Sequence, residues 1–218
     1  MVNAEQNTKP QGISWYHPAF LIATWFGIGK IPFAPGTWGS LFTFPLFIAS
    51  HYLLAFVSSE EQFINLYLFF MAILFFVGQW ATNIYMKRTG THDPKEVVID
   101  EVVGQMLVFL AAFLTICELL KIFDILYDDG GKASIPMVTE LFLHQSVSVA
   151  YITAAIPTYI LCFGLFRLFD IWKPWPINYC DKNIGGGFGV MFDDLFAAMY
   201  AVISFYLIAL LITFIIQT

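Results

Sequence analysis

The stretch VMFDDLFAAMYAVISFYLIALLITFII, residues 190–216, joins an acidic pair, Asp193 and Asp194, to an apolar run long enough to cross a membrane. A second acidic pair, Asp100 and Glu101, interrupts another apolar stretch of the chain. One carboxylate in an apolar helix costs roughly 2.5–3.5 kcal/mol on insertion scales, so four uncompensated ones would cost on the order of 10 kcal/mol. The pairs therefore need a compensating partner, and a hard divalent cation such as Mg²⁺ prefers carboxylate oxygens.

The composition places the chain among integral membrane proteins. Of its 218 residues, 59% are hydrophobic and 12% are charged, and the mean hydropathy is +0.73. We predict an all-α, polytopic membrane helical bundle with about five transmembrane helices. The stretch Trp15–Ile28 is apolar but short, which fits an interfacial or re-entrant helix better than a full span. The expected spans are Ser40–Val57, Phe63–Met86, Val102–Phe123, Val147–Phe169 and Leu195–Ile216.

Composition also bounds the domain organisation and the partners. Residues 1–14 are an expected polar N-terminal tail, and residues 15–218 an expected single membrane-embedded domain. The formal net charge of −6 argues against nucleic acid as a partner. The three cysteines are far apart and lack the spacing of a zinc site or a disulfide framework. Membrane lipids are therefore the expected surroundings of most of the chain.

Lysine and arginine are distributed unevenly over the two ends of the expected spans. Only Lys121 and Lys132 fall on one side, so the other side should be cytoplasmic. The cytoplasmic group is Lys9, Lys30, Lys87, Arg88, Lys95, Arg167, Lys173 and Lys182. Every chemically suggestive segment falls on that side: residues 27–40, 89–101, 167–176 and 185–194. Such convergence is what a single active site at the cytoplasmic membrane surface requires.

Residues 27–40 are rich in glycine and proline between apolar runs. One interpretation is a backbone cradle for phosphate, with Lys30, Thr37 and Ser40 as donors near a helix start. The alternative is a Pro-Gly turn in which Thr37 or Ser40 caps a helix. Glycine-rich loops are common, so this segment alone does not decide between the two.

The segment before Asp100 and Glu101 has the pattern of a helix start. Asp93 suits an N-cap, Pro94 the first helical position, and Glu96 the closing residue of a capping box. The acidic pair would then lie on the second turn, out of reach of any capping role, which favours a ligand role. His92 could polarise a phosphate or a water molecule, although a loop histidine is more often only solvated.

Residues 166–177 end an expected span with charged and aromatic side chains. Arg167 and Asp170 are three apart and could pair on one helix face, and Trp172 suits the membrane interface. The alternative is that Asp170 binds metal while Arg167 or Lys173 binds phosphate. Residues 185–194 place a glycine run before Asp193 and Asp194, which open the last span. One of the two aspartates could be an N-cap, but neighbouring helix residues point about 100° apart.

Together these segments resemble the phosphatidylglycerophosphatase A family, in the family's order and from about Gly27 to Ala198. The matching stretches are residues 27–41, 100–104, 167–177 and 186–194. The resemblance implies Mg²⁺-dependent hydrolysis of phosphatidylglycerophosphate to phosphatidylglycerol and phosphate, at the bacterial inner membrane. Family members can carry a histidine before the second glycine pair, where this chain has Gly185, so His92 becomes the remaining local candidate.

The leading hypothesis is therefore a metal-dependent lipid phosphatase. The expected metal ligands are Asp100, Glu101, Asp170, Asp193 and Asp194. The expected catalytic residues are Asp100, Glu101, Asp170, Asp194 and His92, and the expected phosphate-binding residues are Lys30, Thr37, Ser40, Arg167 and Lys173. The main alternative is a transporter or channel that uses the carboxylates as an ion path, which would require charges at several depths. A scaffold with ion-paired carboxylates is also possible, but it leaves their clustering unexplained.

Overall fold

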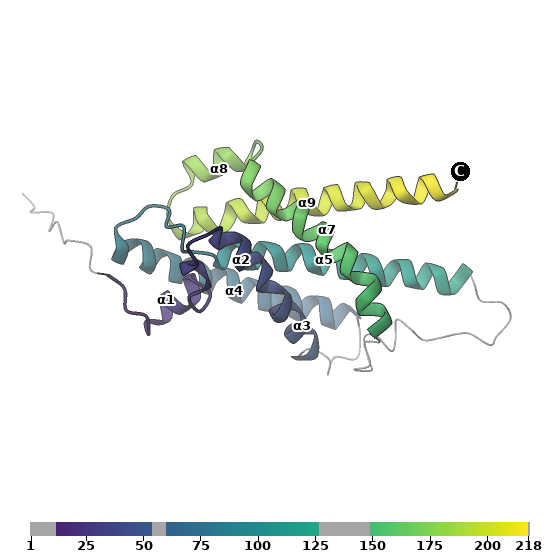
Figure 1. The fold of residues 1–218 in the computed structure, drawn as a ribbon, viewed down its shortest axis with the longest axis horizontal. Coiled ribbons are helices and arrows are strands. Elements are labelled where there is room, and N and C mark those ends of the chain that lie inside the picture. Colours follow the sequence, from purple (N-terminus) through teal and green to yellow (C-terminus); the bar gives the residue numbers. More distant parts are fainter. Residues whose placement is uncertain (1–11, 54–59, 127–148, 218) are drawn as a thin grey trace, which may run out of the picture.

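A computed structural model describes residues 12–53, 60–126 and 149–217, and all regular structure in these ranges is helical (Figure 1). This confirms the expected all-α fold. The α-helices are α1 (Pro18–Ala23), α2 (Pro35–Leu41), α3 (Thr43–Leu53), α4 (Glu60–Thr89), α5 (Ile99–Leu126), α7 (Val149–Trp172), α8 (Ile177–Asn183) and α9 (Gly186–Gln217), with a 3₁₀ turn, η1, at Ile28–Lys30.

Four of the described helices are long and apolar enough to cross a membrane: α4, α5, α7 and α9. They correspond to four of the five expected spans. In α5, 61% of an 18-residue apolar stretch is buried inside the protein, against 22% of the corresponding stretch in each of the other three helices. Helix α5 is therefore the central element, and α4, α7 and α9 pack around it with one side turned outward.

The expected count of about five spans is not confirmed. The segment expected to cross as Ser40–Val57 is divided between α2 and α3, and the described part of α3 has 11 residues. At 1.5 Å per residue this part is roughly 17 Å long, against a hydrocarbon core of ~30 Å. Residues 54–57 of the expected span lie outside the described ranges.

The N-terminal apolar stretch forms only the short helix α1, capped by the His17 side chain, which accepts a hydrogen bond from Ala19 N. It is followed by turns, in agreement with the expectation that Trp15–Ile28 is not a full span. Val98 N donates to Ala23 O at 2.9 Å, which ties this segment to the start of α5. Most of the expected polar tail, residues 1–11, lies outside the described residues.

One end of the bundle collects the polar segments of the chain. Helices α4 and α7 end there and α5 and α9 begin there, while α1, α2 and α8 lie around the same end (Figure 1). Gly29 permits a close backbone approach at this end, because a Cβ on it would lie 1.9 Å from Glu96 O. The short helices thus enclose the first turn of α5, where the acidic pair stands.

Candidate metal and phosphate site

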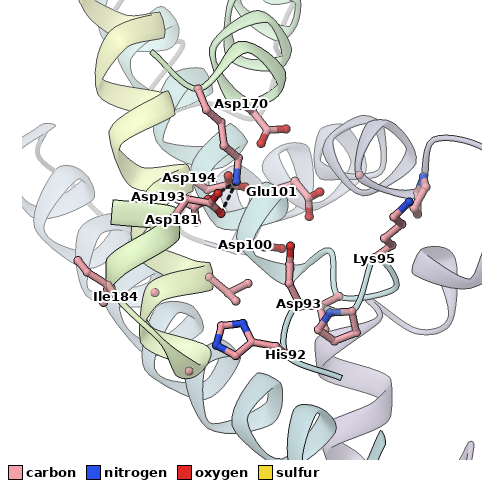
Figure 2. Close-up of a pocket in the computed structure, with 18 of the residues that line it drawn as sticks. His92, Asp93, Lys95, Asp100, Glu101, Asp170, Asp181, Ile184, Asp193 and Asp194 are labelled. Atoms are coloured by element: carbon pink, nitrogen blue, oxygen red, sulfur yellow. Dashed lines mark hydrogen bonds and ion pairs between the residues drawn. The ribbon is translucent and has the colours of Figure 1, made fainter. Parts of the chain in front are cut away.

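A cavity of about 260 Å³ opens at the polar end of the bundle. Its walls come from the four segments that the sequence singled out, at the start of α2, the loop before α5 with the first turn of α5, the end of α7 and the start of α9 (Figure 2). Helix α8, which lies outside those segments, adds Asp181. The charged side chains that line it are Asp93, Lys95, Asp100, Glu101, Arg167, Asp170, Lys173, Asp181, Asp193 and Asp194.

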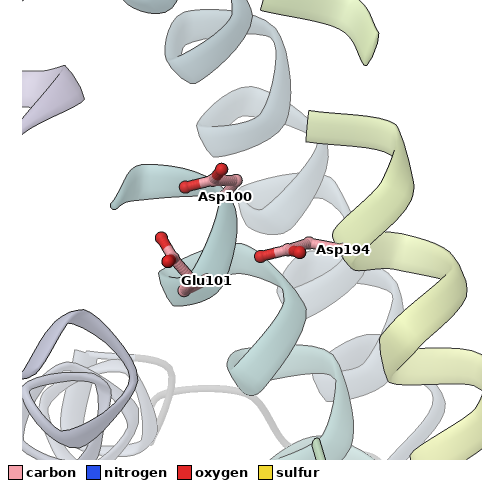
Figure 3. A group of neighbouring side chains, drawn as sticks. All are labelled: Asp100, Glu101 and Asp194. Carbon is pink, nitrogen blue, oxygen red and sulfur yellow. The ribbon is translucent and has the colours of Figure 1, made fainter. Parts of the chain in front are cut away.

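Three carboxylates form the innermost part of this site. Asp100, Glu101 and Asp194 each place one oxygen within 4.8 Å of the other two (Figure 3). Asp100 is 9% exposed and Asp194 is 4% exposed, while the Glu101 side chain is 14% exposed. Asp100 Oδ1, Glu101 Oε2 and Asp194 Oδ2 are buried and have no hydrogen-bond partner in the described structure. We call these three residues the carboxylate triad.

The triad residues stand on two helices whose local structure differs from the prediction. Residues 94–98 are not helical, with a turn at Lys95 and Glu96, and α5 begins only at Ile99. The predicted capping box at Asp93–Glu96 is therefore wrong, and the acidic pair lies in the first turn of α5. There the positive end of the helix dipole favours negative charge.

The second acidic pair lies within a helix that starts earlier than expected. Helix α9 begins at Gly186, so Asp193 and Asp194 stand well inside it and neither is an N-cap. The start of α9 is instead held by Asn83 of α4, whose Oδ1 accepts a hydrogen bond from Gly187 N at 2.8 Å. The sequence analysis did not single out Asn83, because a lone polar residue in an apolar helix gives no sign of its partner.

The other two predicted metal ligands are paired with cations. Asp170 Oδ2 accepts a hydrogen bond from Arg167 Nη1, and Asp193 Oδ2 accepts one from Lys173 Nζ. Arg167 Nη1 also lies 3.8 Å from Glu101 Oε1, so the guanidinium faces both the triad and Asp170. The structure thus divides the five predicted ligands into three with unpaired oxygens and two that are already neutralised.

Lys173 is shared between two aspartates. Its Nζ donates to Asp181 Oδ1 at 2.8 Å as well as to Asp193. Burial alone would lower the pKa of this amine, but the charges and hydrogen bonds of Asp193 and Asp181 outweigh that effect and raise it. Lys173 therefore carries its positive charge at neutral pH. The sequence analysis missed Asp181, whose partner stands eight residues earlier across a turn.

The predicted phosphate donors fall into two groups. Arg167 and Lys173 line the cavity, whereas Lys30, Thr37 and Ser40 are not among its lining residues. Lys30 Nζ instead lies 3.4 Å from Glu96 Oε1. The hydroxyl of Ser40 is buried, donates to Gly36 O at 3.0 Å, and accepts a 3.5 Å hydrogen bond from Arg167 Nη1.

Thr37 occupies the middle of α2 and is half-buried, with its backbone N donating to Ala34 O at 3.0 Å. The contribution of α2 to the cavity is its backbone at Gly36. A Cβ on Gly36 would lie 2.0 Å from Glu101 Oε1 and 3.1 Å from Arg167 Nη1. The glycine therefore lets α2 close directly over the triad.

His92 stands at the rim of the cavity, with an exposed side chain (Figure 2). Its Nε2 lies 3.8 Å from the position that a Cβ on Gly185 would take. The imidazole therefore lies beside the glycine run and apart from the triad (Figure 2).

Comparisons with known proteins agree with this geometry. The family model described as phosphatidylglycerophosphatase A matches residues 21–209, a range that includes every lining residue of the cavity. This chain belongs to the phosphatidylglycerophosphatase A family. The predicted resemblance is confirmed, and so is the expected enzyme class, a phosphatase.

Three relatives show how far the similarity extends. The chain is 34% identical to phosphatidylglycerophosphatase A of Haemophilus influenzae, over 91% of this chain and 93% of the relative. It is 28% identical to phosphatidylglycerophosphatase A of Escherichia coli, over 84% and 78%. It is also 34% identical to a putative phosphatidylinositol-3-phosphatase of Bacteroides thetaiotaomicron, over 88% and 94%. No solved structure matches significantly.

Proposed function

We propose that this membrane protein is a Mg²⁺-dependent phosphatase that hydrolyses phosphatidylglycerophosphate to phosphatidylglycerol and phosphate. The observation that carries the proposal is the carboxylate triad, whose three buried oxygens have no partner in the described structure and which lies in one cavity with Arg167 and Lys173. Names of relatives supply the substrate, and the triad supplies the reason for a metal.

The residues present fit a hard divalent cation. Buried anionic oxygens without partners are costly, and Mg²⁺ binds carboxylate oxygens at ~2.1 Å, so two ligands of one ion lie at most about 4.2 Å apart. The triad oxygens lie within 4.8 Å of one another, which small side-chain rotations would bring into that range. Asp100, Glu101 and Asp194 would therefore hold the ion. When bound, Mg²⁺ polarises phosphoryl oxygens and lowers the pKa of a water ligand.

The remaining lining residues orient the substrate. Arg167 presents a guanidinium between the triad and Asp170, where it can bind phosphate oxygens in pairs. Lys173 lines the same cavity, and its ammonium donates a hydrogen bond to Asp193 Oδ2. A cavity of about 260 Å³ is slightly below the usual range for small-molecule sites, about 300–1,000 Å³, so it suits a headgroup and leaves the acyl chains outside in the bilayer.

The transporter alternative fits the described structure less well. An ion path needs charged groups at several depths, but the cavity gathers its carboxylates at one end of the bundle. Along the described span Ile99–Glu118 of α5, the acidic residue away from that end is Glu118. Family membership also favours hydrolysis over transport.

Phosphate release from the protein purified in detergent tests the proposal. We expect release from phosphatidylglycerophosphate that stops with EDTA and returns when Mg²⁺ is restored. Phosphatidylinositol 3-phosphate belongs in the same assay, since one relative carries that name. Faster release from the inositol lipid would overturn the proposed substrate but keep the metal chemistry, and activity in EDTA would overturn the metal.

We also propose that the enzyme lies in the bacterial inner membrane with its site facing the cytoplasm, on the distribution of lysine and arginine. Single cysteines at the two ends of the bundle test the orientation, because the native Cys117, Cys162 and Cys180 are buried. A cysteine at Glu61 should be labelled in intact spheroplasts, and one at Lys182 only after permeabilisation. The reverse pattern would invert the orientation.

A further inference from the structure

Two lining acids, Asp93 and Asp181, have no role in the proposed metal and phosphate sites, and the one in contact with Lys173 is Asp181. It is an acid at the mouth of a cavity proposed to take an anion, where its charge repels the ligand. It makes one described ion pair, with Lys173 Nζ at 2.8 Å (Figure 2). We propose that Asp181 holds the Lys173 ammonium in place in the empty site and releases it to the phosphate group of the arriving substrate.

The two aspartates on Lys173 are unequal partners. The Asp193 side chain is 6% exposed, whereas that of Asp181 is 36% exposed. A buried charge that loses its partner is left uncompensated, so the pair with Asp193 should persist. An exposed pair contributes only about 0–1 kcal/mol, so a doubly charged phosphate can displace Asp181 at little cost.

Backbone geometry supports a fixed position for this lysine. Lys173 follows the last residue of α7 with φ at 44°, in the left-handed region, and its N donates to Phe169 O at 2.8 Å. Glycine is the usual residue at such a helix end, because a side chain there is strained. A lysine that takes this conformation directs its side chain from a defined point, and its amine has three donors of which the two aspartates use two.

This exchange rests on the proposed function, but its test does not need turnover. Inorganic phosphate is the probe, and its affinity is measured by calorimetry on the purified protein with Mg²⁺ present. We expect Asp181→Asn to bind phosphate about three- to fivefold more tightly than the parent, as expected for release of an exposed ion pair. In the phosphatase assay KM should fall by a similar factor while kcat stays within about twofold.

Asp93→Asn is the matched control, because Asp93 is an exposed acid that lines the same cavity without a described contact to Lys173. It removes the same charge, and we expect it to change phosphate affinity by less than about twofold. In a Lys173→Gln background, Asp181→Asn should bring no gain. If Lys173→Gln does not fold, the second control is Asp181→Glu in the parent protein. This change keeps the ion pair with Lys173, so it should also bring no gain in phosphate affinity.

Three results would overturn the exchange: no gain in Asp181→Asn, an equal gain in Asp93→Asn, or a gain that persists without the lysine charge. A purely structural role for the ion pair predicts that Asp181→Asn brings no gain in phosphate affinity and has a lower unfolding temperature than the parent. If the parent binds phosphate with this dependence on Asp181 but does not hydrolyse phosphatidylglycerophosphate, the proposed function fails and the exchange stands.

Discussion

Helix α5 passes through two regions whose interiors differ in polarity, one aromatic and one acidic. Around Phe109, in the middle of the helix, the rings of Phe44, Phe47 and Tyr159 lie with centroids 4.4–5.5 Å away, so the buried ring packs against aromatic rings of the protein itself. In the first turn, the buried Asp100 and Glu101 face Asp194 and leave carboxylate oxygens without partners. The aromatic side chains of the first region contact one another, whereas the triad keeps three carboxylate oxygens without a described partner.

The boundary between the two regions is visible on one face of α5. Glu101, Gln105 and Phe109 follow one another at intervals of four residues, so they lie along the same face. Gln105 is fully buried, and neither of its amide atoms has a described partner. Polarity therefore decreases along this face, from charged to amide to aromatic. Different turns of one helix therefore serve different purposes: the first turn carries the charged groups of the candidate site, and the middle of the helix packs among aromatic rings.

The largest expected effect is on the triad. Asp194→Asn should lower phosphatase turnover by at least about a thousandfold, because an amide is a weak ligand for a hard cation and the metal supplies several kcal/mol of transition-state stabilisation. Folding should not suffer, since the change removes a buried negative charge. Phosphate release at saturating Mg²⁺ and thermal unfolding without metal measure the two effects.

If the triad binds Mg²⁺ as proposed, the ion should raise the unfolding temperature of the parent, and the same variant should lose most of that rise, because a ligand stabilises only the state that it binds. Asp93→Asn at the exposed rim is the matched control and should keep that rise. Turnover near the parental value in Asp194→Asn would show that Asp194 does not bind the metal, and the role would pass to Asp193.

A smaller effect, on stability and not on turnover, is expected in the aromatic region. Phe109→Ala should reduce the free energy of unfolding by about 3 kcal/mol, the lower end of the range for such truncations, because lipid is as apolar as the protein core and only packing is lost. The rise in unfolding temperature with Mg²⁺ should remain. Reversible unfolding in mixed micelles measures the first quantity and a thermal melt the second.

Phe76 on α4 provides the control, since its side chain is 64% exposed and Phe76→Ala removes the same ring from the outer surface. That change should cost less than about 1 kcal/mol. If Phe109→Ala abolished the Mg²⁺ response in a protein that remains folded, the two regions would be coupled and the comparison would fail.

Much of the architecture follows from the sequence, because apolar length is a local property. A span needs about 20 apolar residues, and the four runs that became α4, α5, α7 and α9 meet that requirement without reference to one another. The run expected to be a fifth span is not confirmed as one, and it is divided at Phe42, where α2 ends and α3 follows. Hydropathy does not register such a break, since both halves are apolar.

The sequence also determined which residue types gather at the site, because charges in a membrane protein are too costly to be there without a use. It could offer one ion pair, because Arg167 and Asp170 are three residues apart and lie on one face of α7. It could not assign the partner of Asp193. The packing of α7 and α8 against α9 decided that Lys173 neutralises Asp193, while Asp100, Glu101 and Asp194 each keep one oxygen without a described partner. Such pairing depends on distances between side chains on different helices, and tertiary packing fixes those distances.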